Sequence, residues 1–172
     1  SDEVYYQFVR SPEYPDSLAA VMADRKVLVL HSFSKAYGLA GLRIGIVIAQ
    51  PDIISRLVHL RRTFHLGTLE MEAVIAAIGD QDHINISVDL AWSGKQWLYD
   101  QFDRLGLKTW PSEANFILFR TAMSSDEVAD RLSQEGILVG PGTRFGIPDC
   151  IRVSVGLPEA NEAFIKALEK VI

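Results

Sequence analysis

A loop set between two short apolar runs is the feature that most limits what this chain can fold into. Residues 26–31 and 46–49 are short, apolar and rich in β-branched side chains, a pattern typical of buried strands. The segment between them contains three glycines, Gly38, Gly41 and Gly45. Because glycine lets the backbone approach a ligand closely, the sequence predicts a ligand-binding loop at the end of the first strand.

Helical and strand-like patterns alternate along the rest of the chain, which favours an α/β fold. Helices are predicted from Pro51, from Thr68 as the N-cap to Gly79, over residues 84–105 with a weak point at Gly94, from a capping box at Ser124 and Glu127 to Gly136, and from Pro158. Strands are predicted at residues 107–110, 115–120, 137–139 and 151–155.

Composition and charge exclude several classes of function. The chain is 48% hydrophobic and 23% charged, as in ordinary soluble globular proteins, and its net charge of -5 gives no basic surface for nucleic acid. The single cysteine, Cys150, cannot form an internal disulfide, and no apolar stretch is long enough to span a membrane. These two features lead us to expect a cytoplasmic protein. The chain begins with Ser1 and shows no leader-like segment, so we expect a fragment or a processed piece.

Hydroxyl groups, an amine and a guanidinium group stand close together in residues 32–45. Ser32 and Ser34 can donate hydrogen bonds to phosphate oxygens, and Arg43 can bind phosphate with a planar fork of donors. Lys35 is then free to be the nucleophile. A lysine amine attacks a carbonyl only when it is unprotonated, and a neighbouring cation favours that form. Together these groups suit a phosphorylated aldehyde.

Other interpretations of these residues have to be considered. An isolated loop lysine is most often solvated, and Arg43 could be a surface charge. A nucleotide-binding loop also combines glycines with a lysine, but the spacing Gly-x-x-x-x-Gly-Lys-Ser/Thr is absent, so that interpretation fails. No metal is predicted, because the four histidines lack the spacing of a metal site and are expected to be structural or solvated: His31, His59, His65 and His83.

Residues 32–45, Ser-Phe-Ser-Lys-Ala-Tyr-Gly-Leu-Ala-Gly-Leu-Arg-Ile-Gly, resemble the lysine signature of the fold-type-I pyridoxal-phosphate enzymes, and within them the histidinol-phosphate aminotransferase family. The resemblance implies pyridoxal 5′-phosphate (PLP) as the cofactor and Lys35 as the residue that binds it covalently. It also implies that Ser32, Ser34 and Arg43 hold the cofactor phosphate.

The N-terminal Asp2-Glu3-Val4-Tyr5 resembles the Asp-Glu-Ala-Tyr segment of the same family, with valine in place of alanine. The resemblance implies that Asp2 pairs with the pyridinium nitrogen of the cofactor and that the Tyr5 hydroxyl reaches its phenolic oxygen. A carboxylate keeps the ring nitrogen protonated, and the protonated ring withdraws electrons from the substrate. Taken alone, an Asp-x-x-Tyr pair would usually be a surface turn.

Two later segments, residues 111–116 and 146–156, resemble the small domain of the family, so the resemblance covers nearly the whole chain. It implies that Arg152 binds the acidic group of the substrate, although an arginine at a strand end can also form a structural ion pair. Asn115 is a further candidate for substrate binding, or it caps backbone groups. Arg144 would add a second cation for a phosphorylated substrate.

The resemblance also divides the chain into the end of the large-domain sheet at residues 1–82, a linking helix at residues 83–106 and a small α/β C-terminal domain at residues 107–172. Family members are roughly twice as long, so we expect a C-terminal part that lacks half of the cofactor site. Residues 62–68 depart from the Pro-Phe-Asn-Val-Asn that relatives often carry there, which leaves the substrate open.

The implied activity is transamination in a homodimer, with histidinol phosphate as the amino donor and 2-oxoglutarate as the acceptor. Threonine-phosphate decarboxylase, a relative with this fold, breaks a different bond, and a broad amino-acid aminotransferase would accept other donors. The remaining alternative is a non-catalytic isolated domain that folds without holding the cofactor.

Overall fold

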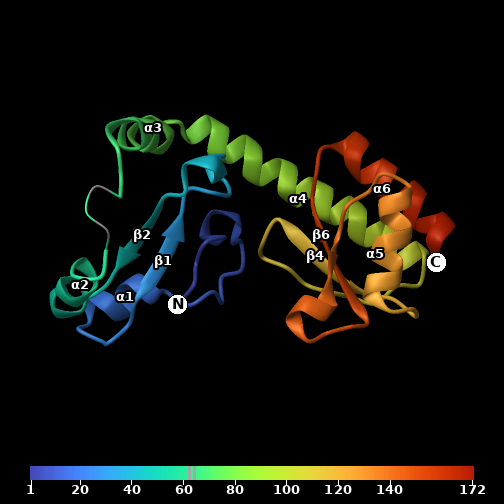
Figure 1. The fold of residues 1–172 in the computed structure, drawn as a ribbon, viewed down its shortest axis with the longest axis horizontal. Helices are drawn as coiled ribbons and strands as arrows, with labels where there is room; N and C mark the ends of the chain where they lie inside the picture. The colour runs from blue at the N-terminus through green and yellow to red at the C-terminus, as the bar shows by residue number, and fades with distance from the viewer. Residues whose placement is uncertain (62, 64) are drawn as a thin grey trace. The chain divides into compact units, whose positions relative to one another are not determined.

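The computed structural model describes residues 1–61, 63 and 65–172. The chain forms two compact units, Ser1–Ser87 and Val88–Ile172 (Figure 1). Arg62 and Phe64, which belong to the divergent segment 62–68, lie outside the described residues. Both units combine helices with strands, so the predicted α/β class is confirmed.

An antiparallel pair of strands forms the centre of the first unit. β1 (Val29–Ser32) pairs with β2 (Gly45–Ile48), and Ser32 at the end of β1 lies opposite Gly45 at the start of β2. The N-terminal residues run beside β1 through a parallel bridge between Asp2 and Leu30. The loop that joins the two strands contains a short 3-10 helix, η2 (Ala40–Leu42). The predicted strand–loop–strand unit is therefore present.

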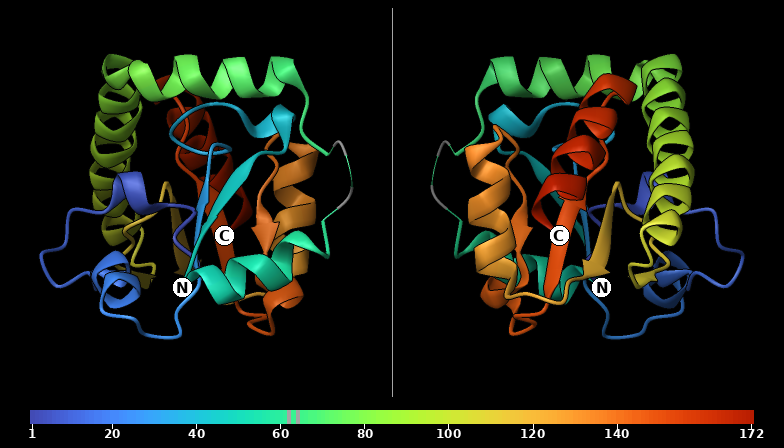
Figure 2. Two further views of the ribbon diagram at one scale, coloured as in Figure 1. Left: turned by 90° about the vertical axis from the view of Figure 1, so that its left-hand side faces the viewer. Right: turned by 90° about the vertical axis from the view of Figure 1, so that its right-hand side faces the viewer.

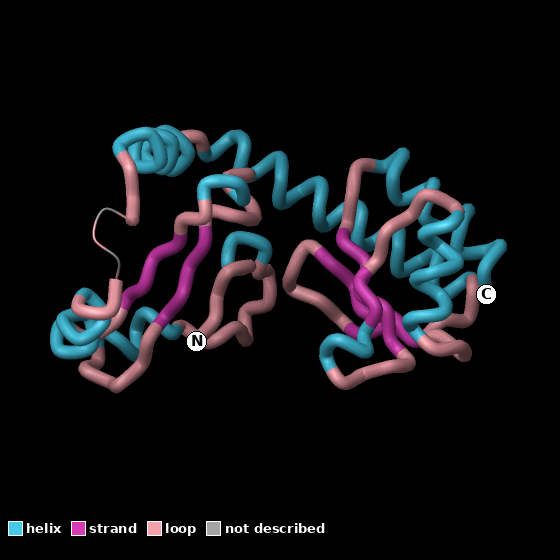
Figure 3. The backbone as a smooth tube through the Cα atoms, in the orientation of Figure 1, coloured by secondary structure: helices cyan, strands magenta, loops and turns pink. Residues whose placement is uncertain are grey.

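Two helices of the first unit precede the strand pair and two follow it: η1 (Tyr6–Phe8), α1 (Ser17–Met22), α2 (Pro51–Val58) and α3 (Thr68–Gly79). The side chain of Asp16 caps α1 by accepting a hydrogen bond of 2.8 Å from the Ala19 amide. The Gln50 side-chain amide donates to the Val21 carbonyl oxygen and so ties α1 to the start of α2. Both helices lie at the end where β1 begins and β2 ends (Figure 3).

The prediction that residues 46–49 form a buried strand is wrong in one respect, because β2 forms but is not buried. Ile46 and Val47 remain 41% and 42% exposed. In the described residues, β2 has one neighbouring strand, β1, and its apolar side chains are not covered by other parts of the unit. The same holds for α3, whose exposed apolar side chains are Leu69, Met71, Ile75 and Ile78.

A long helix, α4 (Gln81–Arg104), stands where a linking helix was predicted, and the boundary between the two units falls within it. Gly94, the expected weak point, lies within this helix in a helical conformation. A Cβ atom at this position would lie 2.5 Å from Cγ1 of Val155, so glycine permits close packing there. No helix formed by the described residues is long and apolar enough to cross a membrane.

The second unit contains an antiparallel sheet in the order β3-β4-β6-β5. Its strands are β3 (Thr109–Trp110), β4 (Phe116–Arg120), β5 (Gly140–Pro141) and β6 (Cys150–Ser154). Two helices, α5 (Ser125–Gln134) and α6 (Pro158–Val171), pack together over this sheet, and a 3-10 turn, η3 (Gly142–Phe145), leads toward β6 (Figure 2).

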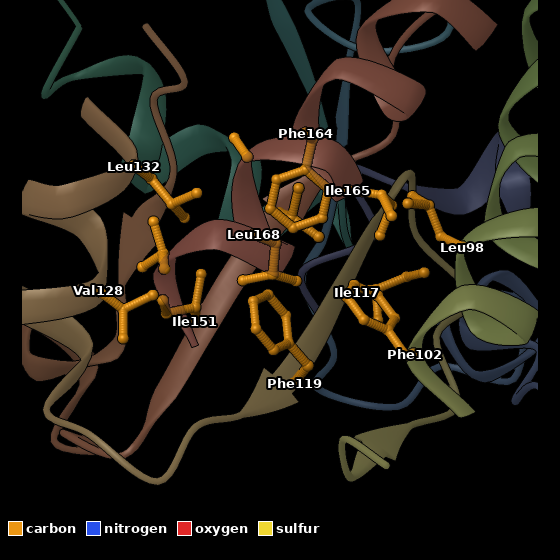
Figure 4. Close-up of a cluster of buried hydrophobic side chains, with 13 residues drawn as sticks. Leu98, Phe102, Ile117, Phe119, Val128, Leu132, Ile151, Phe164, Ile165 and Leu168 are labelled. Atoms are coloured by element: carbon orange, nitrogen blue, oxygen red, sulfur yellow. The ribbon is translucent and has the colours of Figure 1, made fainter. Parts of the chain in front are cut away.

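The hydrophobic core of the second unit lies between one face of the sheet and three helices. α4 contributes Leu98 and Phe102, and α6 contributes Phe164 and Leu168 (Figure 4). The rings of Phe102 and Phe119 stack with their centres 4.7 Å apart. Alternate residues of the strands fill the space beneath the helices, as expected for a sheet with one covered face: Ile117, Phe119, Ile151 and Val153.

Three local predictions need correction. Thr68 is the first helical residue of α3, and Gly67 is its N-cap. Ser124 is the N-cap of α5, but its side chain makes no capping hydrogen bond, so the predicted capping box does not form. The third strand of the second unit is β5 at Gly140–Pro141 instead of residues 137–139, because pairing with β6 begins only where Gly140 meets Arg152.

We expect Leu168→Ala to lower the free energy of unfolding of the second unit by about 2–5 kcal/mol, because it empties a fully buried position. Leu138→Ala is the matched control, since Leu138 is 86% exposed and its loss should change stability by no more than about 0.5 kcal/mol. Urea unfolding followed by tryptophan fluorescence measures both, because all three tryptophans belong to this unit. Equal effects would contradict the location of the core.

Candidate functional site

Hydrogen bonds within the loop between β1 and β2 fix the position of Lys35. The Phe33 amide donates to the Ile44 carbonyl oxygen at 3.3 Å and closes the loop at its base. The Gly38 amide donates to the carbonyl oxygen of Lys35 at 2.9 Å, and Gly38 has a φ of 71°, which a residue with a side chain adopts only at a cost. Lys35 itself is half-buried. The tight turn after Lys35 therefore depends on glycine.

Ser32, Ser34 and Arg43 line one depression of about 370 Å³ at the end of β1. Val4 of the N-terminal segment lines it as well. The Ser34 amide donates to the Ser32 hydroxyl oxygen at 3.1 Å, which orients that hydroxyl within the loop. The three residues predicted to hold a phosphate therefore come together in one pocket, and their donors are the kind that phosphate oxygens accept from.

The backbone around Arg43 is specialised for this arrangement. Arg43 has a left-handed φ of 56°, and its guanidinium Nη1 donates to the Ala40 carbonyl oxygen at 2.8 Å. Two residues later, a Cβ atom on Gly45 would lie 2.9 Å from the His31 carbonyl oxygen, which is closer than a side chain allows. Glycine at position 45 therefore lets β2 begin directly beside β1.

Lys35 meets the N-terminal segment next to the pocket. Its Nζ lies 5.2 Å from the centre of the Tyr5 ring. Tyr5 and Lys35 are not among the described residues that line the pocket, but each directly follows one that does, Val4 and Ser34. The Asp2 carboxylate accepts a hydrogen bond of 3.3 Å from the Val4 amide. Asp2 is bridged to Leu30, so the six predicted cofactor residues lie on two neighbouring segments of the first unit: the end of β1 with its loop, and the N-terminal residues that pair with β1.

Sequence reasoning missed a buried ionisable pair behind these residues. Glu3 is 3% exposed, and its Oε2 lies 3.1 Å from Nε2 of His31, which was predicted to be structural or solvated. Burial alone would raise the pKa of the Glu3 carboxyl, but hydrogen bonds from Ser17, His31 and Ser1 outweigh burial and lower it below its ordinary value of 4.5. Only the pairing of residues 1–3 with β1 reveals this contact, so no local sequence signal could have found it.

In the second unit, Arg152 lies on the face of the sheet opposite the core. Its strand neighbours Ile151 and Val153 point into the core, so alternation directs Arg152 to the other side. The guanidinium carbon lies 4.0 Å from the centre of the Phe116 ring, a cation–π contact. Arg152 also lines a depression of about 330 Å³ beside β5. A fixed, half-buried cation of this kind can bind a carboxylate or phosphate.

The other two predicted substrate residues stand in different settings. Asn115 precedes β4, and its carbonyl oxygen accepts a hydrogen bond of 2.9 Å from the amide of Val155, which directly follows β6. Arg144 is exposed in η3. The antiparallel pairing of β4 with β6 thus brings Asn115 near the strand that carries Arg152, whereas Arg144 belongs to a separate turn. Within the described residues, no group of three or more His, Cys, Asp or Glu side chains could hold a metal ion.

Comparison with known proteins gives a consistent result. The family model "Aminotransferase class I and II" matches residues 1–168. The histidinol-phosphate aminotransferase of Moorella thermoacetica is 43% identical over 172 residues, which cover 99% of this chain and 45% of that protein. The chain spans about half the length of the curated relatives it matches.

Solved structures agree with these matches. Histidinol-phosphate aminotransferase from Sinorhizobium meliloti, in complex with pyridoxal-5′-phosphate, aligns with a TM-score of 0.88 and 27% identity over 99% of this chain and 47% of that one. L-threonine-O-3-phosphate decarboxylase from Porphyromonas gingivalis aligns with a TM-score of 0.84 and 25% identity over 98% of this chain and 53% of that one. The resemblance drawn from the sequence motifs is confirmed.

We expect Gly38→Ala to loosen the lysine loop, because a left-handed φ costs a residue with a Cβ atom about 1–2 kcal/mol. Gly41→Ala is the matched control, since a Cβ there meets nothing within 4 Å. Amide hydrogen exchange of a peptide covering residues 33–39 should become about tenfold faster in Gly38→Ala and stay unchanged in Gly41→Ala. Equal exchange in both variants would show that the turn does not require glycine.

Proposed function

Since this chain belongs to the class I and II aminotransferases, we propose that it supplies the lysine-bearing part of a PLP-dependent transaminase that acts on histidinol phosphate with 2-oxoglutarate as the amino acceptor. The convergence of Ser32, Ser34 and Arg43 on one pocket, next to the contact between Lys35 and Tyr5, carries the proposal. The whole activity is assigned to the intact enzyme, of which this chain corresponds to about half.

The residues present fit PLP on structural grounds. The pocket of about 370 Å³ lies within the usual range for small ligands, roughly 300–1,000 Å³, and it offers two hydroxyls and a guanidinium for the phosphate. Tyr5 would donate to the phenolic oxygen, and the carboxylate of Asp2 would hold the proton on the ring nitrogen. When bound, PLP supplies an aldehyde for the amine of Lys35 and a ring that withdraws electrons.

Lys35 would carry two tasks in this site. Its amine is the nucleophile that binds the cofactor, and once released by the incoming substrate it can accept a proton from the α-carbon of that substrate. The loop hydrogen bonds around Phe33 and Gly38 keep Nζ near the Tyr5 ring, so the amine stays in place during both tasks.

Arg152 would bind the acidic group of the substrate. Phe116 supports the guanidinium from one side, which fixes its plane for a two-pronged contact with a carboxylate or a phosphate. Asn115 and Arg144 are assigned to the same substrate, with Arg144 as a second cation for a phosphoryl group. The intact enzyme is proposed to be a cytoplasmic homodimer, divided here into residues 1–82 of the large domain, a linking helix at 83–106 and the small domain at 107–172.

One alternative is favoured by a specific observation. The structural match to L-threonine-O-3-phosphate decarboxylase is nearly as good as the match to histidinol-phosphate aminotransferase, with TM-scores of 0.84 and 0.88. The two reactions break different bonds, so assays of amine transfer and of carbon dioxide release separate them. Amine transfer from histidinol phosphate to 2-oxoglutarate, by the intact enzyme, would support the proposal, and carbon dioxide release would overturn it.

Covalent labelling tests the cofactor site on this chain directly. Borohydride converts the bond between a lysine amine and the aldehyde carbon of PLP into a stable secondary amine, and peptide mass then identifies the lysine. We expect a single adduct on Lys35 and none after Lys35→Ala. Lys26 and Lys170, which are exposed, serve as internal controls. No adduct, or adducts on these controls as well, would support the non-catalytic alternative.

A further inference from the structure

A buried carboxylate connects the two segments that carry the proposed cofactor residues. Glu3 lies between Asp2 and Tyr5 in the N-terminal segment, and His31 lies directly before Ser32 on β1. Their side chains meet at 3.1 Å between Oε2 and Nε2. The other carboxylate oxygen, Oε1, accepts a hydrogen bond of 2.9 Å from the Ser1 hydroxyl. A carboxylate so far removed from water is rare unless it is paired, so this contact needs an explanation.

The surrounding contacts make the pair a rigid junction. The Glu3 amide donates to the Leu30 carbonyl oxygen at 2.9 Å, directly beside the side-chain contact. The Tyr6 ring stacks on the His31 ring, with 5.2 Å between centres and planes 14° apart. His31 is therefore held by a carboxylate and by a ring that both come from the N-terminal segment.

We propose that Glu3 and His31 are positioning residues that hold Asp2 and Tyr5 in register with Ser32, Ser34 and Lys35. The proposal rests on the proposed function, because it concerns the placement of that cofactor site. His31 lines the same depression as Ser32, Ser34 and Arg43, but the role proposed for the pair is to place Asp2 and Tyr5. They act by fixing two segments that are otherwise joined by backbone hydrogen bonds, by the stacking of Tyr6 on His31 and by the contact of Lys35 with the Tyr5 ring.

Small displacements at such a site have large effects. A shift of about 1 Å in the position of a reacting group can reduce a rate roughly a hundredfold. Tyr5 follows Glu3 by two residues and lies against Lys35, so any slip of the N-terminal segment moves the ring relative to Nζ. A leucine in place of His31 would leave the Glu3 carboxylate buried without this partner, which favours such a slip.

Three variants test the proposal: His31→Leu, His31→Arg and His59→Leu. His31→Leu should weaken PLP binding, followed by absorbance, by about tenfold and slow borohydride labelling of Lys35 to a similar degree. His31→Arg, which can again donate to Glu3, should recover affinity to within about threefold of the wild type. His59→Leu makes the same substitution at an exposed histidine and should behave as the wild type.

A measurement without cofactor separates failure of this proposal from failure of the proposed function. Amide hydrogen exchange at Glu3 and Leu30 should be about tenfold faster in His31→Leu and near wild type in His31→Arg. If the wild type forms no Lys35 adduct while exchange follows this pattern, the proposed function fails and the positioning role stands. Unchanged exchange in His31→Leu, or equal losses in His31→Leu and His31→Arg, would overturn the positioning role.

Discussion

The backbone pairing of the N-terminal residues with Leu30 is the interaction on which the site of the first unit depends. The Leu30 amide donates to the Ser1 carbonyl oxygen, and the Glu3 amide donates back to Leu30, both at 2.9 Å. These bonds place two segments that are distant in sequence side by side at the end where Ser32 enters the lysine loop. The loop could form from its own hydrogen bonds alone, but Tyr5 would then have no fixed position relative to Lys35.

Much of the lysine loop could be predicted from sequence because its determinants are local. Two β-branched runs define the strands, and Gly38 and Gly45 stand where a left-handed φ and a close strand approach exclude a side chain. Pro51 and Pro158 likewise mark the starts of α2 and α6, as expected for a residue with a fixed φ. Features of this kind need no knowledge of the remaining chain.

The predictions that proved wrong concern features that depend on residues distant in the sequence or on the orientation of one side chain. The capping box does not form although Ser124 and Glu127 have the spacing that it requires. A cap needs the serine side chain to be oriented toward the backbone of the helix, and the side chain of Ser124 makes no such hydrogen bond. The start of β5 is set by where Gly140 meets Arg152 on β6, which residues 137–139 alone do not reveal. The contact between Glu3 and His31 is invisible in the sequence for the same reason.

The two units differ in how completely they bury the apolar side chains of their helices and strands. In the second unit, helices from three parts of the chain cover one face of the sheet and bury Leu98, Phe164 and Leu168. In the first unit, the apolar side chains of β2 and α3 remain exposed, although a helix apolar on all sides is normally buried. An apolar run thus predicts that its side chains need to be covered, but it does not identify the surface that covers them. The relatives are about twice as long as this chain.

Three arginines are assigned to anions in the proposed function, and the structure holds two of them, Arg152 and Arg43, differently. Arg152 is part of a central strand and lies against Phe116, so its plane is set by the sheet and is suited to selecting a substrate by orientation. Arg43 donates to Ala40 within the lysine loop itself. A displacement of that loop would move Arg43 together with Lys35, but it would shift both relative to Asp2 and Tyr5. The proposed cofactor site therefore depends on the pairing of the N-terminal segment with β1 as well as on the loop itself.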